Sequence, residues 1–537
     1  MKLTQEALNQ KEWWEEHGYS LPKFDRQAMI SRTVKDPEWV HFGTGNIFKA
    51  FIANMWQGVL NEGKADKGII AAEGFDYEIV EKVSIPHDNL ALAVTLKADG
   101  SIDKTVVGSI AESIEMDTDQ EAAWERLKEI FRNPSLKMAS FTITEKGYNL
   151  TDVKGNYLPV VEADFYNGPG APSSYIGKVT ALCYERYKAG RYPIAMVSMD
   201  NCSHNGTKLF EAVSAYAANW VNNGFAEKEF AEYIVNPRTV GFPWSMIDKI
   251  TPRPDDSVKE MLNKDGFEDT EAIITSKKTF VAPFVNAEEP QYLVIEDIFP
   301  NGRPAMEAGG VIFTDRETVD KVEKMKVCTC LNPLHTSLAV FGCLLGHTLI
   351  SAEMKDAQLK KMVEIIGYKE GLPVVVDPGI ISPKAFIDEV INTRFPNPFM
   401  PDTPQRIATD TSQKLAIRFG ETIKAYAASP DLNVNDLKLI PLVLAGWCRY
   451  LMGINDEGNT FEISPDPLLD SVCPYVADIR LGDAGPFHGK LQPILSNEKI
   501  FGLNLYDAGI GEKVENYFAE LVAGPGAVRG TLKKYTA

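Results

Sequence analysis

The sequence predicts an α/β protein with a doubly wound, Rossmann-type N-terminal domain followed by a mostly α-helical C-terminal domain. A short apolar run leads through a glycine turn into a helix at residues 39–60. Strand-like and helical runs then alternate as far as about residue 312, and only helical periodicity follows. The 537 residues exceed what one hydrophobic core usually accommodates. We therefore expect two domains, residues 1–312 and residues 313–537.

The glycine turn is the first sign of a dinucleotide site. Residues 39–42 read as a strand, Gly43-Thr44-Gly45-Asn46 follows directly, and helical spacing begins at Ile47. Glycines at such a turn let backbone amides approach a pyrophosphate, which the positive end of the following helix favours. Phe48 stands in the place of the third glycine of the full dinucleotide fingerprint, so a plain tight turn remains the alternative.

The next strand-like run indicates which dinucleotide is bound. Residues 68–72 are largely apolar and lead into Glu73, with Asp76 three positions further on. An acid at the end of the second strand holds a ribose 2′-hydroxyl and repels a 2′-phosphate, which favours NAD over NADP. Glu73 is the first candidate and Asp76 the second, although either side chain would also suit a helix cap.

Strand ends further along the chain supply more candidates, because ligands of doubly wound sheets bind beyond the carboxyl ends of the strands. Asp200 and Asn201 follow one such run, and Asn201 is a candidate to hold a substrate hydroxyl or carbonyl, with a helix cap as the alternative. The expected cofactor contacts are Gly43, Gly45, Asn46, Phe48, Glu73, Asp76, Gly108 and Thr144.

A lysine-bearing segment opens the predicted helical domain. We expect Lys326 in a loop or strand end and a helix starting at Asn332, a good N-cap, with Pro333 at the first helical position. His335 then shares a helix face with Asn332. A lysine shielded from water beside a positive helix end has a lowered pKa and can act as a base near neutrality. The alternative is a capped core helix preceded by a surface lysine.

Two further regions carry charged candidates. Asp248 lies in an apolar, strand-like segment and requires a partner, which an ion pair with a nearby basic residue would also provide. One helix is predicted over residues 402–419, where Arg406 and Lys414 would lie near one face. A solvated basic face is the alternative there.

Composition excludes several classes of protein. The net charge of −19 argues against nucleic acid or an anionic membrane as the main partner, but not against a small anionic substrate. We find no apolar run of about 18 residues and no signal-peptide core, so we expect no membrane span. The seven cysteines predict neither a disulfide framework nor a metal site. These features are typical of a cytoplasmic protein.

Several motifs in order make the chain resemble the long-chain polyol dehydrogenase family, which includes mannitol dehydrogenase and the sugar-acid enzymes fructuronate and tagaturonate reductase. The similarity covers most of the chain. The matching motifs are Leu21-Pro22-x-Phe24-Asp25-Arg26, Gly43-x-Gly45-Asn46, Asp200-Asn201-x-x-His204-Asn205-Gly206, Asp248-Lys249-Ile250-Thr251-Pro252, Asn332-x-x-His335 and Arg406-Ile407-Ala408-x-Asp410-x-Ser412-x-Lys414.

The resemblance implies a metal-free hydride transfer between NAD and a sugar acid or polyol. Lys326 would be the general acid or base, while Asn332 and Asn201 would polarise the reacting carbonyl. The residues that would position the substrate are His335, Asp248, Arg406 and Lys414. The preferred substrate pair is D-mannonate and D-fructuronate. The alternatives are tagaturonate, a mannitol-type polyol, or a catalytically inactive sugar-acid-binding homologue.

The chain departs from the family pattern at two positions. Lys326 precedes Asn332 by six positions where the family has five. A loop before the helix would absorb the extra residue, whereas a helical segment would turn the lysine away. Lys49 replaces an arginine that follows the glycine turn in the family, which is expected to change how the cofactor phosphates are held.

Overall fold

The structure, a computed structural model, describes residues 1–537. Contacts divide the chain into one compact unit of Met1–Lys97 and Ser101–Asp320 and a second of Lys321–Ala537 together with Ala98–Gly100. The sequence placed the boundary at residue 312. In the structure, β15 (Ile312–Thr314) pairs in parallel with β14 (Tyr292–Glu296), so the strands of the first unit continue past that point.

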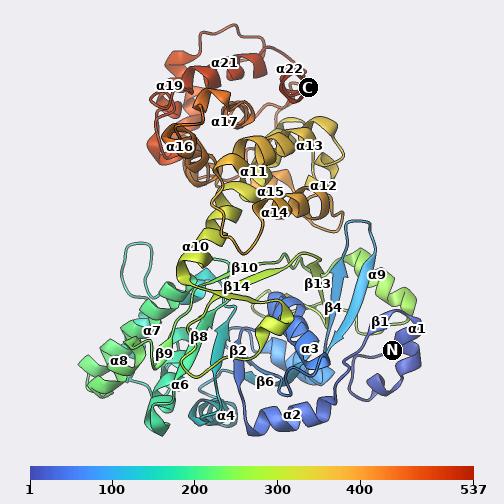
Figure 1. The fold of residues 1–537 in the computed structure, drawn as a ribbon, viewed down its shortest axis with the longest axis vertical. Helices are drawn as coiled ribbons and strands as arrows, with labels where there is room; N and C mark the ends of the chain where they lie inside the picture. The colour runs from blue at the N-terminus through green and yellow to red at the C-terminus, as the bar shows by residue number, and fades with distance from the viewer. The chain divides into compact units, whose positions relative to one another are not determined.

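A parallel six-stranded sheet forms the centre of the first unit (Figure 1). Its strands, in spatial order, are β6 (Ile110–Glu115), β3 (Ile69–Glu73), β2 (Trp39–Phe42), β7 (Met138–Phe141), β8 (Ile194–Ser198) and β9 (Val240–Gly241). This is the order of a Rossmann fold, and it confirms the predicted doubly wound sheet. Strand order reverses between β2 and β7, where such sheets bind their ligands.

Helices cover both faces of this sheet, so its strands are apolar on both sides. Val40 and Phe42 pack with α4, α6, α7 and α8, whereas Trp39 packs on the opposite face with η2 and α3. The helices of this unit are α1 (Lys11–Glu16), α2 (Arg26–Lys35), the π-helical η2 (Phe48–Ala53), α3 (Asn54–Asn61), α4 (Glu121–Arg132), α5 (Pro159–Asn167), α6 (Tyr175–Gly190), α7 (Asn205–Asn222), α8 (Lys228–Val235) and α9 (Asp256–Asp265).

Three smaller sheets complete the first unit. One has the order β1 (Tyr19–Ser20), β5 (Ile102–Val107), β4 (Ala91–Leu96) and β13 (Phe284–Glu288); the second is β10 (Ser245–Asp248), β14 and β15; the third is β11 (Ile273–Ile274) with β12 (Phe280–Val281). Although they are adjacent in the chain, β5 ends at Val107 and Ile110 begins β6 in another sheet.

The second unit is helical, as predicted. Its helices are α10 (Arg316–Met325, which spans the division), η7 (Lys326–Cys330), α11 (Asn332–Leu344), α12 (Ile350–Glu353), α13 (Ala357–Glu364), η8 (Ile365–Gly371), α14 (Pro383–Glu389), η10 (Val390–Arg394), α15 (Pro404–Ile407), η12 (Ala416–Gly420), α16 (Glu421–Ala428), α17 (Leu439–Tyr450), α18 (Leu469–Val472), α19 (His488–Leu495), α20 (Glu498–Phe501), α21 (Gly511–Leu521) and α22 (Ala527–Thr536).

One helical run, Arg316–Leu344, is long and apolar enough to cross a bilayer. Of its most apolar 18-residue window, 78% is buried inside the protein, which is how the core helix of a soluble protein is placed. The sequence predicted no apolar run of this length.

Candidate functional site

The glycine turn lies at the point where the strand order reverses. Gly43 follows β2 with a φ of +103°, and a Cβ there would collide with the carbonyl of Thr142 at the end of β7. Its amide donates to the carbonyl of Ala72 in β3 at 2.8 Å. Gly43 is therefore required by the fold, because only glycine lets β2 turn this closely between its two neighbours.

Gly45 is not explained by the fold. Its φ is not in the left-handed region, and a Cβ there would meet no atom within 4 Å. The open space belongs to a cavity of about 730 Å³ that Gly43, Gly45 and Thr144 line together. An open glycine at the start of a helix, facing a cavity of this size, fits the close approach of a dinucleotide pyrophosphate.

The two acids after β3 differ in their hydrogen bonding. Glu73 accepts from the amide and hydroxyl of Thr44, both at 2.8 Å, and from the amides of Phe75 and Asp76 at 2.9 and 3.1 Å. Its carboxylate is therefore fully used in holding the turn. Asp76 accepts from the Thr275 hydroxyl at 2.6 Å through Oδ2, but its buried Oδ1 has no partner.

An unpartnered buried carboxylate oxygen is uncommon and calls for an explanation. Asp76 is 2% exposed and lines the same cavity as Gly45. The hydroxyl of Tyr175, on the cavity wall, is also buried without a partner. A ribose diol would supply the donors that Asp76 lacks, so Asp76, the second choice from the sequence, fits the ribose position better than Glu73.

The other expected cofactor contacts lie in different surroundings. Thr144 lines the cavity with a φ of +64°, and Asp200 holds its amide at 2.8 Å. Asn46 begins the helix after the turn. Phe48 is fully buried, and Gly108 packs against Pro22 and the side chain of Arg26. Neither Phe48 nor Gly108 is among the residues that line the cavity.

His41 was missed from the sequence, although it stands inside the apolar run of β2. Its ring stacks on Phe48 at 4.3 Å, and its two nitrogens lie 2.7 Å from Ser140 Oγ and 2.8 Å from Thr142 Oγ1. Complete burial lowers the pKa of His41 to about 3, so its ring is neutral. His41 therefore supports the end of β7 that faces Gly43.

Lys49, the residue that replaces the family arginine, is 5% exposed. Burial lowers its pKa to about 8, and the charge of Glu73 partly offsets this. The basic side chain after the glycine turn is thus kept, but with a pKa closer to neutral pH than that of an arginine.

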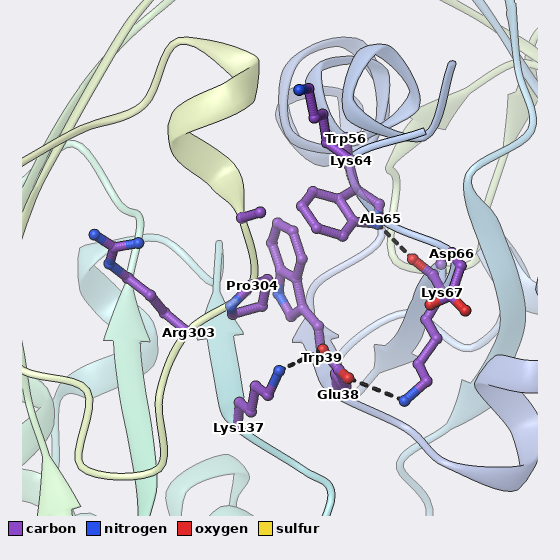
Figure 2. A pocket seen from close by; sticks show the side chains of 12 residues that line it. Glu38, Trp39, Trp56, Lys64, Ala65, Asp66, Lys67, Lys137, Arg303 and Pro304 are labelled. Atoms are coloured by element: carbon purple, nitrogen blue, oxygen red, sulfur yellow. Dashed lines mark hydrogen bonds and ion pairs between the residues drawn. The ribbon is translucent and has the colours of Figure 1, made fainter. Parts of the chain in front are cut away.

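A second cavity of about 260 Å³ lies at the opposite end of β2 (Figure 2). Glu38, just before the strand, pairs with Lys67 at 2.9 Å and with Lys137 at 2.8 Å, as the dashed lines show. Arg303 on its wall pairs with Asp297 and Glu307. These charges satisfy one another, and the amino ends of the strands are not where such sheets bind ligands.

Several residues of the Asp200–Gly206 motif, which contains Asn201, have structural roles. The side-chain amide of Asn205 donates to the carbonyls of Asp200 and Ser245, both at 3.0 Å, and a Cβ on Gly206 would meet the carbonyl of Pro243 at 2.5 Å. These contacts join the start of α7 to β10. Asn201 itself is exposed three positions beyond the end of β8, and Asp248 is buried at the end of β10.

In the second unit, Lys326 lies in helical structure rather than in a loop, so that expectation was wrong. It begins the π-helical η7 and is 5% exposed. The amide of Leu331 donates to the carbonyl of Lys326 at 3.1 Å, five positions apart. This wide turn holds one residue more than an α-helical turn, and it accommodates the six-residue spacing to Asn332. Single π turns of this kind are frequent at functional sites.

Asn332 and His335 stand on the first turn of α11, as expected, with Leu331 rather than Asn332 at the cap position. Burial lowers the pKa of His335 to about 4, so the imidazole is neutral, and its Nε2 has no hydrogen-bond partner. Asp402 Oδ2 lies 3.5 Å away without hydrogen-bond geometry. Arg406 pairs with the other oxygen of Asp402.

Arg406 and Lys414 do not share a helix, so the predicted helix over residues 402–419 was wrong. The α-helix ends at Ile407, and Asp410 has a φ of +55°, which breaks the helical path before η12. Lys414 donates to the carbonyl of Thr409 at 2.5 Å. Burial lowers the pKa of Lys414, and the positive charge of Arg418 lowers it further. No group of three or more histidine, cysteine or acidic side chains is arranged to hold a metal ion.

A Rossmann-type unit with a cavity at its glycine turn, followed by a helical unit, is typical of a two-domain, NAD-dependent oxidoreductase. The family models for the mannitol dehydrogenase Rossmann domain and C-terminal domain match residues 37–308 and 318–522. The chain belongs to the mannitol dehydrogenase family.

Individual relatives agree with this assignment. The chain is 55% identical over 536 residues to D-mannonate oxidoreductase of Thermotoga maritima, covering 99% of each protein. Among solved structures, it resembles Pseudomonas fluorescens mannitol 2-dehydrogenase in complex with NAD and D-mannitol, with a TM-score of 0.67, 25% identity and 99% of each chain covered. A substrate-free D-sorbitol dehydrogenase shares the fold, with a TM-score of 0.78, 23% identity and coverage of 97% of this chain and 98% of the other.

Proposed function

We propose that this protein is an NAD-dependent oxidoreductase that interconverts D-mannonate and D-fructuronate in a reducing, cytoplasmic environment. The observation that carries this proposal is the 55% identity to D-mannonate oxidoreductase over nearly the full length of both proteins. The carboxylate of Asp76 on the cavity wall, whose Oδ1 lacks a partner, favours a free ribose 2′-hydroxyl, and hence NAD, over a 2′-phosphate.

The cofactor fits residues of the first unit. Gly43 and Gly45 would admit the pyrophosphate, Asp76 would bind the ribose, and Thr144 would border the path of the dinucleotide. When bound, the nicotinamide exchanges a hydride with the substrate carbon, and the protein supplies alignment and proton transfer.

The remaining candidate residues would handle proton transfer and stabilise the oxygen of the reacting group. We assign proton exchange with the substrate hydroxyl to the Nζ atom of Lys326. Asn332 and Asn201 would donate to the developing oxyanion, with the positive end of α11 adding to the effect of Asn332. The residues that would position the sugar acid are His335, Asp248, Arg406 and Lys414.

The test is a substrate panel read at the nicotinamide absorbance. Purified enzyme is given D-fructuronate, D-tagaturonate or D-fructose with NADH or NADPH, and the corresponding reduced compounds with the oxidised cofactors. We expect the highest kcat/KM with D-fructuronate and NADH. Preference for D-tagaturonate or D-fructose would reassign the substrate.

The alternative of another class is a sugar-acid-binding homologue without turnover. The only observation that favours this alternative is the six-residue spacing between Lys326 and Asn332. NADH binding without turnover of any member of the panel would support that alternative and refute the enzyme proposal.

A further inference from the structure

Buried arginines in this protein generally find several acceptors. Arg186 donates to five main-chain carbonyls and Arg449 to three. Arg26 donates to three carbonyls and to the side chain of Gln5. A guanidinium has five N–H donors, so these contacts replace much of the water that each side chain loses on burial. All three arginines are explained by the fold alone.

Arg418, in η12, differs from these three, because its side chain is only partly buried and it has a single acceptor. Its one hydrogen bond runs from a terminal nitrogen to the hydroxyl of Thr336 at 2.5 Å. It forms no ion pair, since none of the acidic side chains in the structure lies within 4.0 Å of it. Burial alone lowers the pKa of Arg418 to about 10, with no carboxylate offsetting the loss of water. Even partial removal of a guanidinium from water without a counter-ion has a cost, which an anionic ligand would offset.

Arg418 lies beside the turn that carries the proposed catalytic groups. Thr336, which it contacts, also donates to the carbonyl of Asn332 at 2.9 Å, and η12 packs against both η7 and α11. The charge of Arg418 acts on His335 and Lys414 and contributes to the lowered pKa of each. The neutral imidazole of His335 is thus close to several cations, namely Arg418, Arg406 and Arg394, and to the acid Asp402. Lys414 lies close to Arg418 as well.

Other basic side chains near the family motifs are already engaged. Arg253, in the first unit, lies over the ring of Phe280 at 5.0 Å. Arg406 pairs with Asp402, and its side chain is 62% exposed. Arg418 therefore stands out among these arginines as a cation in a partly dry position that lacks an anion.

We propose that Arg418 binds the carboxylate of the sugar-acid substrate and is the residue that distinguishes sugar acids from neutral polyols. The planar fork of a guanidinium matches a carboxylate in two parallel hydrogen bonds, and Lys414 adds a second positive charge. This assignment rests on the proposed function, because it requires a substrate with a carboxylate.

The test compares a charged ligand with a neutral one on the same skeleton. Binding of D-mannonate and of its carboxamide, D-mannonamide, is measured by titration calorimetry on the full-length protein and on Arg418→Gln. We expect the wild type to prefer the acid by about 10- to 100-fold, as for a hydrogen-bonded charge pair. Arg418→Gln should bind both ligands with similar, weak affinity.

Controls separate this role from a structural one. Arg480→Gln, which removes an exposed arginine of the same unit, should leave both affinities unchanged. NADH binding should be the same in all variants. Arg418→Lys keeps the charge but loses the fork, and it should fall between the wild type and Arg418→Gln. If Arg418→Gln does not fold, Arg418→Lys decides by the same acid-to-amide ratio.

Equal weakening of acid and amide, or an unchanged ratio, would overturn the role of Arg418. If the wild type binds neither ligand, the proposal also fails. Turnover is read separately. An enzyme that reduces D-fructuronate while the ratio is unaffected by Arg418→Gln keeps the proposed function and loses only this assignment. A protein that binds D-mannonate through Arg418 without turnover loses the enzyme proposal and keeps the binding site.

Discussion

At the scale of single residues, hydrogen bonding distinguishes Glu73 from its neighbour Asp76. Glu73 uses both oxygens to hold the glycine turn, whereas Asp76 keeps one buried oxygen unpartnered. The sequence indicated an acid at this strand end, but it favoured Glu73, because position along the chain does not reveal which carboxylate is already satisfied.

Asp76→Ala should lower NADH affinity by about 10-fold and reduce the preference for NADH over NADPH, because a charged hydrogen bond to the ribose is worth about 1.5 kcal/mol or more. Fluorescence titration with both cofactors measures this. Thr275→Val removes the partner of the other Asp76 oxygen and should keep the preference. An unchanged preference in Asp76→Ala would remove Asp76 from the ribose site.

Lys326→Ala should lower kcat by about 10²- to 10⁴-fold, the usual contribution of a general acid or base, while NADH binding stays within a factor of two. Stopped-flow kinetics and NADH titration measure the two quantities. Lys324→Ala is the matched control, because Lys324 is exposed two positions away and should retain activity. Full activity in Lys326→Ala would show that another group exchanges the proton.

At the scale of elements, the turn between β2 and its helix contains two glycines with different reasons to be glycine. Gly43 is required by strand packing, and Gly45 borders open space. The pattern of strand, turn and helix in the sequence predicts that a glycine is needed at such a turn, either for the fold or for a ligand. The structure was needed to show which glycine serves the fold and which borders the open cavity.

Gly45→Ala should therefore leave the melting temperature within about 1 °C of wild type and weaken NADH binding at least about 10-fold, because the added methyl group meets only the dinucleotide. Gly58→Ala, a helical glycine that also borders open space, should change neither property unfavourably. Calorimetry and NADH titration provide the two measurements. Loss of stability without loss of affinity would contradict this explanation.

Two elements of the second unit were not predictable from periodicity. The run around Lys326 is a π turn between two α-helices, and the segment after Arg406 breaks at Asp410. Apolar spacing indicates that helix is present, but it does not distinguish a wide turn from a loop or detect a single residue with positive φ. Arg418 was overlooked for a related reason, because only the packed structure shows that it lacks a carboxylate.

At the scale of the whole molecule, stability depends on opposing titrations. His41 and His335 are neutral when folded, with each pKa below its ordinary value of 6.5, so the unfolded chain binds more protons and stability falls as the pH drops below about 6.5. Glu353 acts in the opposite direction. It is fully buried, both its oxygens lack partners, and burial raises its pKa from 4.5 to about 9.

For Glu353 the folded state binds the additional proton, so its contribution is complete below about pH 4.5 and is lost as the pH rises towards 9. Glu353→Gln should therefore raise stability at pH 8 and flatten the profile, which otherwise falls by up to about 1.4 kcal/mol per pH unit. Urea unfolding between pH 5 and 9 measures this. Glu370→Gln should instead destabilise, because Glu370 accepts from three backbone amides at the start of α17. A profile unchanged by Glu353→Gln would show that the acid is ionised.

The protonated state of Glu353 also offers a spectroscopic use. The acid side chain lies directly against Gly342 in α11, the helix whose first turn bears Asn332 and His335. An un-ionised carboxyl group absorbs in the infrared apart from carboxylates, which are the form taken by most of the chain's 74 acidic residues at neutral pH. Its carbonyl vibration is therefore an intrinsic label, already in place, for following small displacements of that helix during ligand addition.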